Sequence, residues 1–218
     1  KKFSHAAKAG PSIITLIQYD NDKIFEAQFE NFEELMTQFD PSMTNWINVA
    51  GLSDVALLRK LSERFNIHPL ALEDVLNTTQ RPKVEQFEDH FFIVSEMIYE
   101  EEQRITLEQL SIFLGRSYVL TIQEESEHDV FEQVRSRLRA GRGYARKMKA
   151  DYLAYALLDA TVDQFYPVLE SLGDKIESKK AAAAAKVSTV PGYLGEIADP
   201  EEAATIADEI GYPVMIKA

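Results

Sequence analysis

Three strand-like segments follow one another between Asp89 and Glu125, and they constrain the fold more than any other feature. They read DHFFIVSEMIYE, LEQLSIFLG and YVLTIQEE, and the last two flank GRS, a tight-turn signal. Helical patterns stand before and after these strands, but without the strict alternation of strand and helix that a doubly wound parallel sheet needs. We therefore expect a layered α/β domain with a mixed sheet.

The segments before residue 78 add further strands and helices to this layered domain. PSIITLIQYD and KIFEAQF surround the turn signal DND and predict a hairpin, and a short strand is expected around Trp46–Val49. LSDVALLRKLSERFNI has apolar residues at helical spacing, with Ser53 as a plausible N-cap. HPLALEDVLN predicts a short helix with Pro69 in its first turn.

The segments after residue 127 predict two helices. HDVFEQVRSRLRAG is amphipathic and ends at Gly141, as a C-cap glycine would. KADYLAYALLDATVDQFYPVLESLGDKIESKK predicts a longer helix, which Pro167 should kink or break. Its apolar stripe is narrow and favours a stalk-like or coiled-coil-like helix over a fully buried one. The stripe consists of Leu158, Val162, Phe165, Leu169, Leu172 and Ile176.

The composition limits the classes of function. The 218 residues carry a formal net charge of −13, which disfavours non-specific binding to nucleic acid and favours cations. The sequence has no cysteine, so disulfides and thiolate metal sites are excluded. No apolar run approaches the roughly 20 residues of a membrane helix, so we expect these 218 residues to be soluble.

Glu73 and Asp74 stand side by side in the mostly apolar stretch IHPLALEDVLN. Adjacent carboxylates repel each other and resist leaving water unless a cation or hydrogen bonds compensate them. One interpretation is a metal site. The other is an acidic pair that interacts favourably with a helix dipole or caps a helix end, and spacing alone favours this second interpretation.

Several long motifs resemble the N-terminal cytoplasmic domain of the CorA family of magnesium and cobalt transporters. They are FNIHPLALEDVLNTTQRPKVEQFEDHFFIV, EQLSIFLGRSYVLTIQE, DVFEQVRSRLRAGRG and ADYLAYALLDATVDQFYPVLESLGDKIE, and the resemblance covers about residues 13–179. It implies an α/β/α sandwich that leads into a long stalk helix, truncated here. It further implies a homopentamer in the inner membrane, with this part on the cytoplasmic side, attached through two C-terminal membrane helices with a Gly-Met-Asn signature that this sequence lacks.

The resemblance also implies a function and a set of metal ligands. Glu73, Asp74 and Asp159 match carboxylates that line metal sites between neighbouring protomers of the family. We therefore expect a regulatory Mg²⁺ site, with Co²⁺ or another divalent cation as a possible ligand, that favours the closed state of the transporter. The family's remaining ligand, an aspartate further along the stalk, is missing, so the site should be weak. Asp163, one turn after Asp159, is expected to be solvated.

The end of the chain has a different character. An alanine run begins at residue 181, and we place a junction at about residues 181–186. Residues 187–218 resemble a fragment of a biotin-dependent carboxylase with an ATP-grasp fold. We interpret this tail as foreign to the transporter domain or misassigned, because Lys217 lacks the glycine-rich loop that an ATP site requires. It should hold a small helix over residues 199–211 and a strand in YPVMIKA. The expected domains are 1–150, a stalk start at 151–180, and a tail at 181–218.

Other candidate features favour packing over chemistry. His68 and His90 lack the spacing of a metal-binding pair and are expected to pack. The basic run RSRLRAGRGYARKMK has one aromatic residue in an acidic domain, so we expect it to face a neighbouring protomer or lipid headgroups rather than nucleic acid. A structural turn is expected in TQRPKVE. The chain is predicted not to be an enzyme, the alternatives being a metal-dependent hydrolase or an ATP-grasp carboxylase fragment.

Overall fold

The computed structural model describes residues 12–101, 104–125, 129–141 and 143–184, together with residues 202, 205 and 206. The chain divides into two compact units, Lys1–Val168 and Leu169–Ala218. The small helix and the strand predicted for the tail lie outside the described residues, apart from residues 202, 205 and 206, which are helical.

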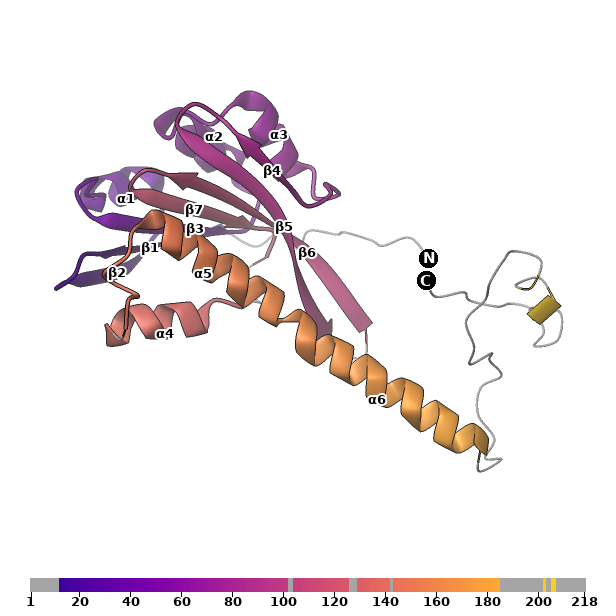
Figure 1. The fold of residues 1–218 in the computed structure, drawn as a ribbon. Coiled ribbons are helices and arrows are strands. Elements are labelled where there is room, and N and C mark those ends of the chain that lie inside the picture. Colours follow the sequence, from indigo (N-terminus) through magenta and orange to yellow (C-terminus); the bar gives the residue numbers. More distant parts are fainter. Residues whose placement is uncertain are drawn as a thin grey trace. The chain divides into compact units, whose positions relative to one another are not determined.

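The first unit is built on a seven-stranded mixed sheet (Figure 1). The strand order is β2-β1-β3-β7-β6-β5-β4, in which β3 and β7 are parallel and every other neighbouring pair is antiparallel. This arrangement confirms the predicted mixed sheet. The strands are β1 (Ile13–Tyr19), β2 (Ile24–Phe29), β3 (Thr44–Ala50), β4 (Lys83–Gln86), β5 (His90–Glu101), β6 (Arg104–Gly115) and β7 (Tyr118–Gln123).

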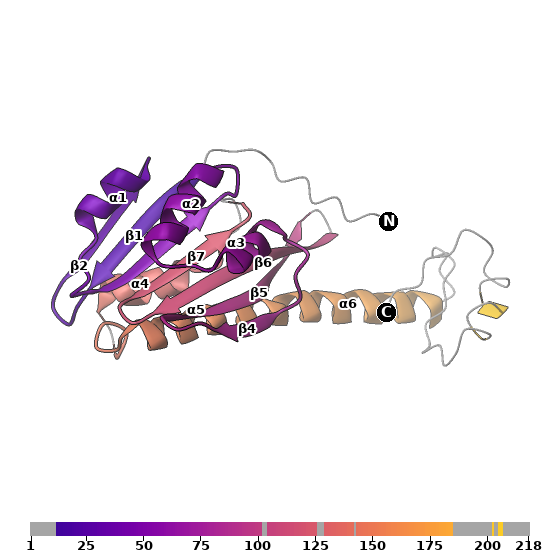
Figure 2. The ribbon, with the colours of Figure 1, turned by 90° about the horizontal axis from the view of Figure 1, so that it is seen from above.

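Helices cover both faces of this sheet, with α1 to α3 on one side and α4 and α5 on the other (Figure 2). Their bounds are α1 (Phe32–Gln38), α2 (Val55–Arg64), α3 (Pro69–Leu76), α4 (Glu132–Ala140) and α5 (Ala150–Asp163), and α6 (Phe165–Ala184) runs from the first unit into the second. The three layers confirm the expected α/β/α sandwich.

Each face of the sheet has its own hydrophobic core. Neighbouring residues of β3 supply both, because successive side chains of a strand point to opposite faces. Ile47 packs in the core beneath α1 to α3, whereas Trp46 packs in the core beneath α4 and α5, and both are fully buried. A central strand between two helical layers therefore places large apolar side chains on both faces, as Ile47 and Trp46 do in β3.

Two glycines end elements as the sequence predicts. Gly115 closes β6 at the GRS turn, where the ring of Tyr118 occupies the space that a Cβ atom would take. Gly141 ends α4 with a φ of 60°, a left-handed conformation that glycine adopts without steric cost. The turn and the helix end therefore both depend on a missing side chain.

Some local expectations are wrong. The N-cap of α2 is Asp54, whose carboxylate accepts a hydrogen bond from the backbone N–H of Leu57, and not Ser53. The expected turn in TQRPKVE ends at Lys83, where strand β4 begins and pairs with β5. Helix α1, capped by Asn31, is not predicted from the sequence. A four-residue strand and a two-turn helix carry too little periodicity to identify, and tertiary contacts decide them.

The predicted long helix is broken, as Pro167 suggests. α5 ends at Asp163 and α6 begins at Phe165. Proline has no N–H to donate to the carbonyl of Asp163, four residues earlier, and its ring crowds that carbonyl, so a continuous helix is disfavoured. The buried face of α5 also differs from the predicted stripe, whose Val162 is 55% exposed. The residues of α5 that are buried are Ala150, Leu153, Ala154, Ala156, Leu157, Ala160 and Thr161.

Candidate metal-binding site

Helix α3 presents Glu73 and Asp74 because of how it is anchored. Pro69 stands in its first turn, and the ring Nδ1 of His68 accepts a hydrogen bond from the backbone N–H of Leu70 at 3.2 Å. Ala71 and Val75, four residues apart, are buried and define the face that packs on the sheet. The two acidic residues lie between these positions and are turned away from the core.

An open groove runs beside α3 and joins it to the edge strand β4. Carboxylates and aromatic rings share its lining, with Glu73, Asp74 and Glu85 as its three acidic members. The full lining is His68, Leu70, Glu73, Asp74, Asn77, Gln80, Glu85 and Phe87. Three carboxylates in one open groove provide oxygen ligands of the kind that Mg²⁺ and Ca²⁺ prefer.

A lysine from β4 lies among these carboxylates. The Nζ atom of Lys83 is 2.6 Å from Oδ2 of Asp74 and 2.8 Å from Oε1 of Glu85. The hydrogen bond to Asp74, and after it the one to Glu85, raises the pKa of Lys83, which therefore stays protonated. Lys83 and Glu85 are two residues apart on one strand and so point to the same face. That period of two would reveal the pair from the sequence if β4 were recognised as a strand.

Asp159 lies on the other side of the sheet from these residues. It is half-buried on α5, whose apolar residues belong to the core opposite the one that contains Ala71 and Val75 of α3. Throughout the described parts of the chain, no group of three or more His, Asp or Glu side chains is arranged to hold a metal ion. The structure therefore brings Glu73 and Asp74 together on α3, and one chain does not bring Asp159 to them.

The two histidines pack, which confirms the sequence prediction. His68 stacks on Phe87 with ring centroids 5.7 Å apart, and His90 stacks on the same ring at 5.1 Å. His90 also meets the ring of Phe113 edge-on. Burial lowers the pKa of His90, so it stays neutral within this aromatic column.

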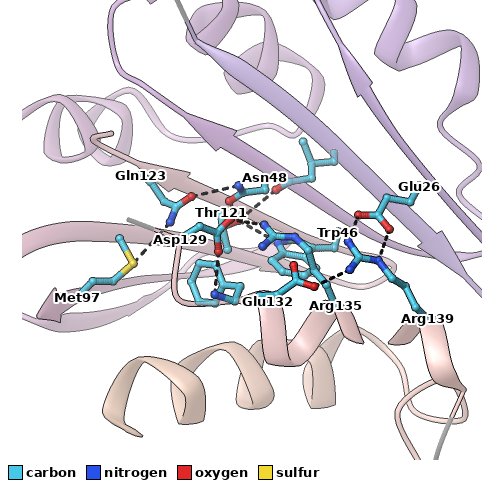
Figure 3. A network of polar contacts seen from close by, with 12 residues as sticks. Glu26, Trp46, Asn48, Met97, Thr121, Gln123, Asp129, Glu132, Arg135 and Arg139 are labelled. Carbon is cyan, nitrogen blue, oxygen red and sulfur yellow. Dashed lines mark hydrogen bonds and ion pairs between the residues drawn. The ribbon is translucent and has the colours of Figure 1, made fainter. Parts of the chain in front are cut away.

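Two arginines of the basic run, Arg135 and Arg139, are engaged within the chain (Figure 3). Arg135 pairs with Asp129 at 2.5 Å and lies 4.9 Å above the ring of Trp46. Arg139 holds both carboxylate oxygens of Glu26 at 2.7 Å, an interaction that lowers the pKa of Glu26. These arginines stabilise α4 against the sheet. The predicted contacts of the basic run with a neighbour or lipid stay a prediction for its other members.

Polar groups buried between β3, β7 and α4 form a chain that the sequence does not reveal (Figure 3). The indole N–H of Trp46 donates to Thr121 Oγ1 at 2.9 Å, and this hydroxyl donates to Asn48 Oδ1 at 2.6 Å. Asn48 in turn donates to Gln123 Oε1 at 3.1 Å. Each member has a partner, so the network fixes the parallel register of β3 and β7 without an orphaned polar group.

Glu108 is a buried carboxyl group on the α5 side of the sheet. Its side chain accepts a hydrogen bond from the backbone N–H of Glu125 at 2.9 Å, and the residue is only 3% exposed. Burial raises the pKa of Glu108 to about 7. The next residue, Gln109, points to the opposite face, where its Nε2 donates to the backbone carbonyl of Asp74 at 3.0 Å. Sequence reasoning missed both residues.

Comparison with known proteins identifies relatives of the chain. Residues 41–208 match a family model described as "CorA-like Mg2+ transporter protein". The cobalt/magnesium transport protein CorA of Thermotoga maritima is 40% identical over 166 residues, which make up 75% of this chain and 47% of that protein. The chain thus spans about half the length of this relative. Among the described helices, none is both long and apolar enough to cross a membrane.

The fold has solved relatives, and the carboxylase resemblance is short. The soluble domain of CorA from Methanocaldococcus jannaschii superimposes with a TM-score of 0.58 at 20% identity, covering 78% of this chain and 64% of that one. The propionyl-CoA carboxylase alpha chain of Ruegeria pomeroyi is 64% identical over 50 residues, 23% of this chain but 7% of that protein. The family model covers most of the sequence and agrees with the fold. The chain belongs to the CorA-like Mg²⁺ transporter family.

Proposed function

We propose that this chain is the Mg²⁺-sensing part of a divalent-cation transporter. Glu73 and Asp74 of one protomer and Asp159 of its neighbour line a site for a hydrated ion. The observation that carries this proposal is the position of the carboxylates on opposite faces of one sheet, since Asp159 can meet the α3 groove only across an interface between two chains. The proposed assembly is a homopentamer, attached to the inner membrane with this part on the cytoplasmic side.

The proposed mechanism is electrostatic. Without Mg²⁺, the facing carboxylates of adjacent protomers repel each other, and the subunits separate. With Mg²⁺ bound, the ion bridges and screens these charges and favours a closed assembly. Mg²⁺ keeps several of its waters, so a few carboxylates around a hydrated ion suffice. Binding is weak, near the millimolar range, because a tighter site would remain saturated and report nothing. Co²⁺ is a further candidate ligand, and the carboxylates have no catalytic role.

The test is Mg²⁺-dependent self-association of the 218-residue chain, measured by sedimentation velocity. Millimolar MgCl₂ should shift the wild-type chain towards larger species. The triple variant Glu73→Gln, Asp74→Asn and Asp159→Asn should lose this shift. Asp163→Asn removes an exposed carboxylate one turn further along α5 and serves as the matched control, which should respond as the wild type does. An unchanged Mg²⁺ response in the triple variant would contradict the proposal.

A further inference from the structure

Lys83 forms an ion pair with Asp74, one of the carboxylates that the proposed function assigns to a metal ion. Its Nζ atom contacts Asp74 Oδ2 at 2.6 Å, and both side chains are half-buried, at 29% and 22% exposed. The pairing of Lys83 with Val94 across β4 and β5 holds the lysine in place, and its ammonium lies 5.7 Å from the centre of the Phe92 ring. The backbone of Asp74 is held by Gln109 of β6. The backbones of both partners are therefore held by the sheet.

We propose that Lys83 is a built-in competitor of the divalent cation at Asp74 and sets the weak affinity of the site. This inference rests on the proposed function. The Lys83 ammonium and a metal ion would both bind Oδ2 of Asp74, and their like charges repel each other in the groove. Because the lysine is part of the chain, its local concentration does not change with the solution. A cation that binds Oδ2 of Asp74 must displace Lys83 or share this oxygen with it.

Glu85 makes this exchange possible without leaving the lysine unpaired. Lys83 already contacts Glu85 Oε1 at 2.8 Å, so an ammonium released from Asp74 keeps one carboxylate partner. A lysine left without a partner would oppose the exchange, since an unpaired and partly buried charge is costly. The position of Glu85 lowers that cost and keeps the exchange reversible.

The charges of the groove also favour a divalent over a monovalent ion. Glu73, Asp74 and Glu85 carry three negative charges, and Lys83 carries one positive charge. One divalent ion would balance the remaining two. A monovalent ion brings no more charge to Asp74 than the ammonium it displaces, so it gains little from the exchange. Lys83 is thus a determinant of specificity as well as of affinity.

The experiment compares Lys83→Met with Arg81→Met in the 218-residue chain. Both variants remove one positive charge, but Arg81 is exposed and stands two residues before Lys83, outside the ion pairs with Asp74 and Glu85. The probe is Mn²⁺, whose binding is followed by water-proton relaxation with MgCl₂ as competitor. Lys83→Met should bind Mg²⁺ roughly 3- to 10-fold more tightly than the wild type, and Arg81→Met should stay within about 2-fold.

Each outcome decides the inference. An equal gain in Mg²⁺ affinity in Lys83→Met and Arg81→Met would show a general charge effect and overturn the inference. The absence of Mn²⁺ binding to both the wild type and Lys83→Met would overturn it as well. An unchanged affinity in Lys83→Met, combined with weaker binding in Asp74→Asn, overturns the role of Lys83 but leaves the proposed function standing. Unchanged binding in Asp74→Asn and in Glu73→Gln overturns the proposed site and the inference with it.

A second measurement needs no variant of Lys83. Lysine side-chain resonances of the wild-type chain are followed by NMR during a MgCl₂ titration. The Lys83 ammonium should shift as Mg²⁺ enters, because its partner changes from Asp74 and Glu85 to Glu85 alone. A Lys83 resonance that stays constant while Mg²⁺ displaces bound Mn²⁺ would overturn the competition.

Discussion

Two charged regions of the first unit, one at α3 and one at α4, use their ion pairs differently. At α4, Arg135 is only 10% exposed, stacks on Trp46 and pairs with Asp129. Arg139 donates hydrogen bonds to both carboxylate oxygens of Glu26. At α3, two carboxylates share the single ammonium of Lys83 beside an open groove. The comparison of Arg135 with Lys83 teaches that an ion pair holds the fold where the cation is buried and has one carboxylate partner, whereas an ammonium with two carboxylate partners beside an open groove can exchange between them.

The largest effect is expected from Arg135→Met at α4. This variant leaves Asp129 without its partner and removes a cation from the Trp46 ring, and it should lower the free energy of unfolding by about 3 kcal/mol. Urea unfolding measures the change. Arg137→Met, on an exposed position of the same helix, is the control and should stay within about 0.5 kcal/mol of the wild type. A loss of similar size in both variants would mean that α4 is not held by this particular pair.

Glu108 is a buried carboxyl group for which the described residues supply no opposite charge, and so it sharpens the contrast between matched and unmatched groups. Its pKa in the folded chain is about 7, above the ordinary value of 4.5. The folded state therefore binds more protons than the unfolded state between these values, and stability falls as the pH rises from about 4.5 to 7. Glu108→Gln should remove this slope and stabilise the chain at pH 8 by about 2–3 kcal/mol.

Urea unfolding at pH 5.5 and at pH 8 checks the prediction for Glu108. Glu88→Gln neutralises an exposed carboxylate and should leave the pH dependence as it is in the wild type. A Glu108→Gln variant that keeps the wild-type slope would assign that slope to other groups.

The smallest effect on stability is expected from Asp74→Asn at α3. Its ion pair with Lys83 is partly exposed, and Lys83 keeps Glu85 as a partner, so the loss should stay below about 1 kcal/mol. The same urea titration measures it beside Arg135→Met. A loss at Asp74 as large as that at Arg135 would break the comparison, because the α3 pair would then hold the fold as the α4 pair does.

The fold was predictable wherever a pattern is local and long. The β1–β2 hairpin, the β6–β7 turn at Gly115, the end of α4 at Gly141 and the helix opened by Pro69 all follow from neighbouring residues. Helix α1 and strand β4 did not, since seven and four residues give too weak a pattern. The predicted boundary at residues 150 and 151 between a domain and a stalk remains a prediction.

The candidate site was predictable only in its residue types. Family motifs identified Glu73, Asp74 and Asp159, and their joint role in metal binding is still a proposal. The partner of Asp74 was not predictable, because Lys83 reaches it only through the pairing of β4 with β5. Likewise, the burial of Glu108 depends on β7 and the residues that follow it, and no property of segment 104–115 alone raises its pKa.

The sequence by itself determined the class of the fold, the positions of most turns and helix ends, and the family, because these depend on local periodicity, glycine, proline and extended motifs. Only the tertiary structure decided that β3 lies beside β7 and that α3 and α5 cover opposite faces of the sheet. It also decided that Lys83 forms an ion pair with Asp74. The physical reason is that charge pairing and burial depend on residues distant in the chain, which meet only when the sheet closes.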